Sequence, residues 1–297
     1  MVRVLILGGT GMLGHKLWQS FRHRFETWAA VRSHHTRYDR FQLFENERLL
    51  VGVDANDMDS IVRVLTVVHP DVVINCIGII KQLSSSQDPI ISLTINSLFP
   101  HRLARLCQAI GARCIHISTD CVFSGHKGQY IETDVSDAED LYGRSKYLGE
   151  VSGENCLTLR TSIIGRELET QSGLVEWFLG NQGKSVRGYT NAIYSGFTTL
   201  ALAGIIAHVI EEHPDLSGLY HVSAKPITKH DLLVLIRDTY GLSIEIEPYA
   251  DIWIDRSLDS ERFWTAVKSS PPSWVEMIRD MYEDSTPYDQ WRQHNAS

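Results

Sequence analysis

The chain has 297 residues, 43% of them hydrophobic, and its 28 basic and 36 acidic side chains give a net charge of −8. This apolar content excludes an intrinsically disordered chain and suffices for one large domain or two smaller ones. The acidic balance disfavours binding to a phosphate backbone, so no nucleic-acid partner is expected.

The first apolar run, Val4–Leu7, stops at a glycine and is too short for a signal peptide. No run approaches the roughly 18 apolar residues of a membrane span, so no membrane partner is expected. The five cysteines form no CxxC pair and the histidines are scattered, which disfavours a disulfide framework or a metal site. We therefore expect a cytoplasmic protein without a bound metal ion.

Strand-like and helix-like segments alternate over the first 160 or so residues. Leucines and aromatic residues at helical spacing predict helices between short β-branched runs. This β-α-β-α order predicts an α/β fold with a doubly wound parallel sheet and helices on both faces. The expected strands are Val2–Leu7, Thr27–Val31, Val72–Ile77 and Cys114–Ser118, and the expected helices cover 12–21, 61–68 and 98–110.

The second part of the chain is less regular. It contains an expected helix at Leu200–Val209, a strand at Gly218–Val222 and a helix at Leu232–Ile236, the last with a capping box from Thr228 to Asp231. We predict a dinucleotide-binding domain over residues 1–165, to which residues 190–215 return. A smaller, partly interleaved substrate lobe would comprise residues 166–189 and 216–297.

Glycines follow the first expected strand at the spacing GxxGxxG, namely Gly8, Gly11 and Gly14. In a strand-turn-helix context, such glycines let backbone amides and the positive end of a helix approach a pyrophosphate. A turn without a ligand is the alternative. The predicted cofactor contacts at this turn are Gly8, Thr10, Gly11, Met12, Leu13 and Gly14.

The end of the second strand helps to choose the cofactor. An acidic residue there would hold the ribose 2′-hydroxyl of NAD, whereas an arginine suits the 2′-phosphate of NADP. Arg32 and Ser33 occupy this place, and the segment lacks a carboxylate. NADP(H) is therefore favoured over NAD(H), with a solvated surface arginine as the alternative interpretation.

Tyr142 and Lys146 form a YxxxK pair on the helix expected after the fourth strand. Residues four apart share a helix face, and a nearby ammonium favours the phenolate, which would lower the pKa of the tyrosine. Ser118 and Thr119 end the fourth strand, at the carboxyl edge where doubly wound sheets bind ligands. The Thr119 hydroxyl can donate a hydrogen bond to a substrate oxygen there.

The strings GGTGMLG, STDCVFSG and YGRSKYLGE together resemble the extended short-chain dehydrogenase/reductase superfamily. More narrowly, they resemble the dTDP-4-dehydrorhamnose reductase family. Weaker matches continue through Asn75, Asn96, the string LRT at 159–161 and GLYHV at 218–222, with an echo in RSLD at 256–259.

This resemblance implies a Rossmann domain, a nucleotide-sugar lobe and NAD(P)H-dependent reduction of a 4-keto-6-deoxy nucleotide sugar. It makes Tyr142 the proton donor, Lys146 a ligand of the nicotinamide ribose and Thr119 the residue that orients the carbonyl. The cofactor contacts that it adds are Asp54 near the adenine, Cys76, Ile77 and Gly78 along the ribose, Asn96 and Ser118.

The chain also departs from the pattern of that family. The stretch after the third strand is NCIGIIKQ rather than alanine-rich, and Ile163 stands where the reductases commonly have a tryptophan. Because these positions face the sugar, a UDP-linked N-acetylated 6-deoxy sugar is an alternative to the dTDP-linked substrate. The predicted substrate contacts are Lys81, Asp120, Phe123, Trp177 and Arg256.

Some of these substrate contacts have an ordinary alternative. Lys81 is equally suited to a solvated surface position, and Trp177 to simple packing or a subunit contact. Arg256 could bind phosphates as a bidentate donor. The sequence is compatible with a homodimer.

Two other functions compete with reduction. Dehydratases of this superfamily carry a Thr-Asp-Glu string, but here Cys121 replaces the glutamate base, which disfavours dehydration and leaves epimerisation open. The other alternative is a non-catalytic NADP-binding subunit of another enzyme. The presence of Thr119, Tyr142 and Lys146 favours catalysis over this alternative.

Overall fold

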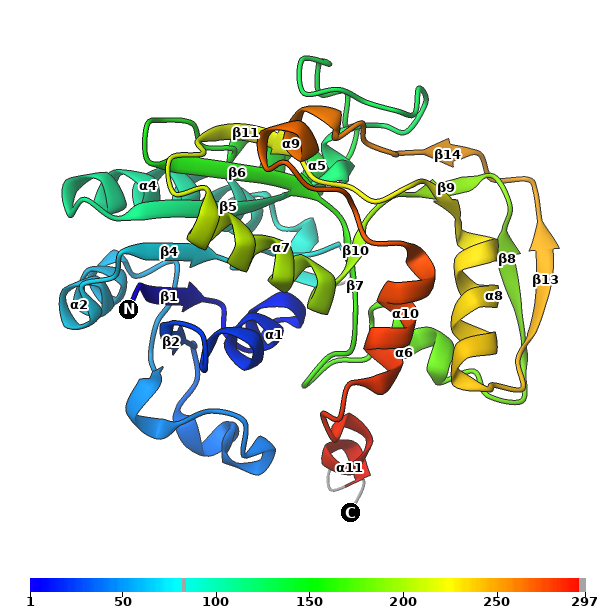
Figure 1. Ribbon diagram of the computed structural model, residues 1–297, viewed down its shortest axis with the longest axis horizontal. Coiled ribbons are helices and arrows are strands. Elements are labelled where there is room, and N and C mark those ends of the chain that lie inside the picture. The colour runs from blue at the N-terminus through cyan, green and yellow to red at the C-terminus, as the bar shows by residue number, and fades with distance from the viewer. Residues whose placement is uncertain (82–83, 294–297) are drawn as a thin grey trace.

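The computed structural model describes residues 1–81 and 84–293. A central sheet carries helices on both faces, and a smaller lobe of short strands and helices lies on the side toward which the strands point (Figure 1). Among the described residues, no helix is long and apolar enough to cross a membrane.

The central sheet is seven-stranded and parallel, with the spatial order β11-β6-β5-β4-β1-β2-β3. The order reverses between β1 and β4, so a ligand crevice is expected outside the carboxyl ends of these two strands. The strands are β1 (Arg3–Leu7), β2 (Glu26–Ala30), β3 (Leu49–Leu50), β4 (Val72–Asn75), β5 (Arg113–Thr119), β6 (Cys156–Thr161) and β11 (Gly218–His221).

Helices cover the sheet on both sides, which explains the continuous apolar run of β1. Val4 and Ile6 pack beneath α1 (Met12–Phe21) and α7 (Thr199–Glu212). Leu5 and Leu7 pack against α2 (Met58–Val68) and α4 (Phe99–Ala109) on the opposite face. All four side chains are fully buried, as expected for a parallel strand between two helical layers.

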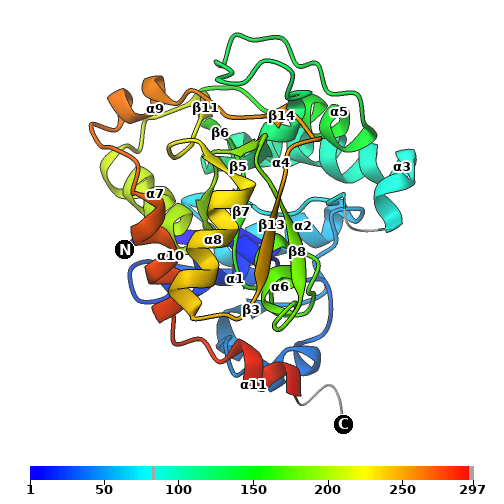
Figure 2. The ribbon, with the colours of Figure 1, turned by 90° about the vertical axis from the view of Figure 1, so that its right-hand side faces the viewer.

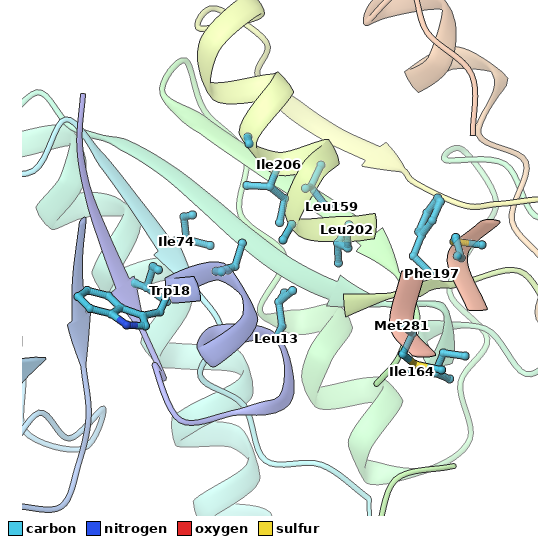
Figure 3. Packing of buried hydrophobic residues seen from close by; sticks show 14 of the residues in the cluster. Leu13, Trp18, Ile74, Leu159, Ile164, Phe197, Leu202, Ile206 and Met281 are labelled. Atoms are coloured by element: carbon cyan, nitrogen blue, oxygen red, sulfur yellow. The ribbon is translucent and has the colours of Figure 1, made fainter. Parts of the chain in front are cut away.

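Figure 3 shows the first of these cores. Leu13 from α1 lies close to Leu202 and Ile206 from α7, whereas Trp18 from the same helix lies nearer the sheet residue Ile74. The helical spacing of the apolar residues in the sequence therefore corresponds to the buried face of α1.

Helices α3 (Pro89–Ser92), the π-helix η5 (Leu93–Leu98) and α4 follow one another without a break. The end of η5 packs closely against α5 (Leu141–Leu148), where a Cβ added to Gly149 would lie 1.8 Å from the Asn96 carbonyl oxygen. The short 3-10 helices are η1 (His35–Arg37), η2 (Asp39–Phe41), η3 (Asn46–Arg48), η4 (Ser84–Gln87) and η6 (Asp120–Val122).

The lobe is built from small sheets with the strand orders β10-β7, β12-β9-β14 and β13-β8. Figure 2 shows α8 alongside β8 and β13. Its strands are β7 (Ile163–Ile164), β8 (Ser185–Tyr189), β9 (Ala192–Tyr194), β10 (Phe197–Thr198), β12 (Ile227–Thr228), β13 (Glu245–Tyr249) and β14 (Ile254–Asp255). The helices after residue 163, besides α7, are α6 (Leu174–Leu179), α8 (Lys229–Tyr240), α9 (Glu261–Ala266), α10 (Trp274–Glu283) and α11 (Tyr288–Gln293).

The predicted α/β fold with a doubly wound parallel sheet is confirmed. One detail of the division into lobes is wrong, because β11 lies within the range 216–297 but pairs with β6 in the central sheet. The expected capping box of α8 is half formed. Thr228 Oγ1 accepts a hydrogen bond from the Asp231 amide at 2.9 Å, while the Asp231 carboxylate pairs with His230.

Candidate active site

The glycine turn lies at the carboxyl end of β1, where the strand order reverses. Gly8 has a φ of +82°, and a Cβ there would lie 3.1 Å from the Cys76 carbonyl carbon. A Cβ on Gly14 would lie 2.1 Å from the Gly8 carbonyl oxygen, so the turn and the first turn of α1 nearly touch. The structure thus brings the predicted glycines against the Cys76–Gly78 segment.

The start of α1 fits a pyrophosphate. Gly11 caps the helix without a side-chain hydrogen bond, and the first helical turn has no acidic residue. Its amides therefore present partial positive charge that the chain does not itself neutralise. On the other side of the turn, a Cβ on Gly173 would lie 2.9 Å from the Met12 side chain, which places the segment before α6 against this turn.

The residues predicted to contact the adenosine end lie beyond β2 and β3. Arg32 is exposed, and within the described chain it forms no ion pair. Arg37 Nη1 donates to the hydroxyl of Ser33 at 3.5 Å and its Nε donates to Glu169 at 2.7 Å. Asp54 is half-buried, and its carboxylate accepts from the Asn56 amide at 2.9 Å.

Asn75 and Asn96 hold the backbone of the segment that follows β4. Asn75 Oδ1 accepts from the Ile77 amide at 3.1 Å. The Asn96 side chain accepts from the Ile79 amide at 2.9 Å and donates to the Ser145 hydroxyl at 3.1 Å. Asn96 thereby links this segment to α5, and its amide is engaged in these bonds rather than open to a ligand.

The three predicted catalytic side chains come together beside this segment. Asp140 caps the start of α5, where its carboxylate accepts a hydrogen bond from the Gly143 amide at 2.7 Å. Tyr142 therefore lies in the first turn of this helix. Thr119 ends β5, and its side chain is near enough to act on the pKa of Tyr142. Lys146 Nζ donates to the Ile117 carbonyl at 2.7 Å, and a Cβ on Gly78 would lie 4.0 Å from this nitrogen.

The protonation of the pair differs from the sequence-based expectation. Burial raises the pKa of Tyr142 above its ordinary value, instead of Lys146 lowering it. Burial also lowers the pKa of Lys146 to about 8. The reason is that Lys146 points its ammonium at the β5 backbone, so in this arrangement Tyr142 is a protonated acid at neutral pH.

Charged groups surround the side of the site that faces the lobe. Asp120 is buried, its Oδ1 accepts from the Thr119 hydroxyl at 3.2 Å, and burial raises its pKa against the opposing charges of Arg256 and Lys229. Lys81 Nζ donates to Asp140 at 2.6 Å and lies 5.5 Å from the centre of the Tyr142 ring. These contacts bring three of the predicted substrate contacts, Lys81, Asp120 and Arg256, to one place.

The prediction that the Phe123 ring contacts substrate is corrected by the structure. Its ring is fully buried and stacks on Tyr130 at 4.1 Å, with the Arg160 guanidinium on it at 5.2 Å. The ring therefore packs beneath the site, and only its carbonyl, which accepts from Arg256 Nε at 2.7 Å, contacts the charged cluster. Trp177 is 42% exposed on α6 and stays a prediction.

Sequence reasoning missed three side chains. Lys229 begins α8, and its charge acts to lower the pKa of Asp120. Tyr194 on β9 is buried within reach of the charge of Asp120. Glu150 follows α5 and binds Ser118 and Arg160. The string GE at 149–150 was a visible signal for Glu150, whereas Lys229 and Tyr194 approach the site only through the folding of the lobe.

Cys121 lies beside Tyr142, where dehydratases have a glutamate. Burial raises the pKa of the Cys121 thiol to about 12, so it is a neutral thiol at physiological pH and no substitute for a carboxylate base. Within the described ranges, no group of three or more His, Cys, Asp and Glu side chains is arranged to hold a metal ion.

Comparisons with known proteins show the family and the fold. A family model described as "RmlD substrate binding domain" matches residues 2–286. The beta subunit of methionine adenosyltransferase 2 from Rattus norvegicus is 28% identical over 84% of this chain and 75% of its own length. A probable low-salt glycan biosynthesis reductase from Haloferax volcanii is 29% identical over 74% of both chains.

Among solved structures, a dTDP-4-dehydrorhamnose reductase from Bacillus anthracis in complex with NADP superimposes with a TM-score of 0.79. The superposition covers 96% of this chain and 100% of that one at 21% identity, which shows the shared fold. Because the family match spans nearly the whole chain, this protein belongs to the RmlD substrate binding domain family.

Proposed function

We propose that this chain reduces the 4-keto group of a 6-deoxy nucleotide sugar at the expense of NADPH. The observation that carries this proposal is that Thr119 at the end of β5 and Tyr142 and Lys146 on α5 meet beside the segment that contacts the glycine turn. The substrate is dTDP-4-dehydrorhamnose or a UDP-linked N-acetylated relative.

Three side chains carry out the proton chemistry. The glycine turn from Gly8 to Gly14 would hold NADPH, which would supply the hydride for the carbonyl carbon. The Tyr142 hydroxyl donates its proton to the carbonyl oxygen, and the new O–H bond forms as the phenolic one breaks. Thr119 donates a hydrogen bond that orients this oxygen, while the Lys146 ammonium would hold the nicotinamide ribose.

The charged side of the site supports an anionic substrate. Arg256, Lys229 and Lys81 gather around Asp120, Cys121 and Asp140. Cations near a buried carboxylate can bind a diphosphate on one side and a sugar hydroxyl through the carboxylate on the other. This arrangement suits a sugar joined to a nucleoside diphosphate.

Oxidation of NADPH with a panel of 4-keto nucleotide sugars tests the proposal. We expect turnover with at least one dTDP- or UDP-linked 4-keto-6-deoxy sugar, followed by the loss of the near-ultraviolet absorbance of NADPH. The product should be the corresponding 4-hydroxy sugar by mass spectrometry. The same panel with NADH in place of NADPH provides the cofactor control.

The 28% sequence identity to the beta subunit of methionine adenosyltransferase 2 supports a second candidate function, that of an NADP-binding subunit of another enzyme. Tight NADPH binding without turnover of any member of the panel would favour this candidate over a reductase. Interconversion of 4-epimers without net consumption of NADPH would instead indicate an epimerase.

Replacing Arg32 with alanine tests the cofactor preference. We expect the Kd for NADPH to rise by about tenfold or more, because a charge-assisted arginine–phosphate bond contributes roughly 1.5–3 kcal/mol. The Kd for NADH should change little, since NADH has no 2′-phosphate. The matched control is Arg37→Ala, because Arg37 is already paired with Glu169. Equal weakening of both cofactors in Arg32→Ala would show that the 2′-phosphate assignment is wrong.

A further inference from the structure

Glu150 lies just beyond the end of α5, one turn after Lys146, and its side chain is buried. Its Oε1 accepts from the Ser118 hydroxyl at 2.7 Å. Arg160 donates to both carboxylate oxygens, through Nε and Nη2, at 2.7 Å each. The two side chains are 7% and 4% exposed, so this ion pair is almost completely removed from solvent.

These contacts tie the helix that carries Tyr142 and Lys146 to two strands of the sheet. Ser118 lies on β5 between Thr119 and Ile117, and the Ile117 carbonyl accepts the bond from Lys146 Nζ. Arg160 lies on the neighbouring strand β6. A shift of Glu150 would therefore move the strand that holds both Thr119 and the acceptor of Lys146.

The rest of the network keeps the Glu150 carboxylate in place. Arg160 Nη1 lies 3.1 Å from His221 Nε2, and His221 Nδ1 lies 2.9 Å from the Tyr130 carbonyl oxygen. The Arg160 guanidinium also covers the Phe123 ring. Since every member is buried or nearly so, the network has few alternative arrangements.

The surroundings of Lys146 give the Glu150 charge a specific effect. The titratable groups that interact electrostatically with the ammonium are the Cys76 thiol after β4, His116 on β5 and Glu150 after α5. Burial raises the pKa of Cys76 and lowers that of His116, so both are neutral near pH 7. Glu150 is the carboxylate among them, and its charge raises the pKa of Lys146 against the effect of burial.

We propose that Glu150 is a positioning residue of the proposed reduction: it locks the end of α5 onto β5 and places a carboxylate near the Lys146 ammonium, one turn from Tyr142. The inference rests on the proposed function. Glu150 does not touch substrate or cofactor in this arrangement, and it acts through Lys146 and Ser118.

An NMR titration of Lys146 tests the proposal without requiring turnover. In protein labelled with carbon-13 at lysine Cε, the Lys146 signal is assigned by its loss in Lys146→Met and followed against pH. We expect Glu150→Gln to lower the pKa of Lys146 from about 8 by roughly half a unit or more, because a nearby opposite charge is removed. Glutamine keeps the shape and can still accept from Ser118.

Two further variants separate charge from structure. Glu150→Asp keeps the carboxylate. The pKa of Lys146 should therefore shift less from the parent value in Glu150→Asp than in Glu150→Gln. Glu176→Gln is the matched control, because Glu176 is also buried and paired with an arginine, Arg166 at 2.9 Å, but is absent from the groups around Lys146. Its Lys146 titration should equal that of the parent.

The pH profile of reduction provides the kinetic measurement. If a keto sugar is turned over, the limb of kcat that Lys146 controls should move to lower pH by the same amount in Glu150→Gln. An unchanged Lys146 titration in Glu150→Gln would overturn the proposal even if the enzyme is a reductase. A shifted titration without turnover of any sugar would uphold the coupling while refuting the proposed function.

Discussion

Replacing Tyr142 with phenylalanine should lower kcat for keto-sugar reduction by about 10²–10⁴-fold, the range that a positioned general acid contributes. The substitution removes the hydroxyl but keeps the ring that packs beside Lys81. Because burial raises the pKa of Tyr142, its hydroxyl is protonated at neutral pH and serves as the acid. The variant should lose this proton donor and keep its fold.

The Kd for NADPH should remain within about twofold of the parent value, since the cofactor turn and Lys146 are unchanged. Oxidation of NADPH measures kcat, and quenching of protein fluorescence measures Kd. The matched control is Tyr147→Phe, on the same helix but 44% exposed, which should leave kcat unaltered. A Tyr142→Phe variant that turns over as fast as the parent would remove Tyr142 from the mechanism.

The sheet could be predicted because its strands are strongly periodic and lie between recognisable helices. Val4 to Leu7 are buried on both faces, and this gives the continuous apolar run that is typical of parallel strands. The glycine turn was equally visible, since Gly14 is required by a close backbone approach between residues near in sequence. Local constraints of this kind leave a local pattern.

The lobe could not be predicted in the same way. Strands such as β12 and β14 have two residues each, and they are defined by pairing with β9, more than 30 residues away in the chain. The C-terminal segment likewise joins the start of the chain, where Tyr288 bonds His15 at 2.7 Å and Asp284 pairs with Lys16 at 2.5 Å. Such non-local contacts carry no periodic signal.

The candidate site contains features that the local sequence predicts and features that depend on non-local contacts. The YxxxK spacing correctly placed Tyr142 and Lys146 on one helix, because the spacing is a property of the helix itself. The predicted direction of the Tyr142 pKa shift was wrong. Burial raises this pKa, and the Lys146 ammonium is directed at the β5 carbonyl of Ile117. Phe123 was misassigned for a related reason: its string marks the site, but its ring is enclosed by Tyr130 and Arg160.

A comparison of two glycine-to-alanine substitutions should give opposite changes in stability. Gly14→Ala should lower the free energy of unfolding by more than about 2 kcal/mol, because the added Cβ would lie 2.1 Å from the Gly8 carbonyl oxygen and neither backbone can yield cheaply. The displaced turn should also weaken NADPH binding, since the amides that face the pyrophosphate would move with it.

Gly204→Ala is the matched variant, because Gly204 also lies within a helix, α7, but is exposed with no atom within 4 Å of an added Cβ. Alanine there should raise the free energy of unfolding by about 0.5–1 kcal/mol, since it restricts the unfolded chain and favours the helix. Urea denaturation and NADPH titration of both variants measure the two effects. If Gly14→Ala were as stable as the parent and bound NADPH equally well, the close approach of the turn to α1 would not be what fixes the cofactor site. Both glycines stand in a helix of this sequence, so the contrast between them isolates the contact with Gly8 from helix propensity.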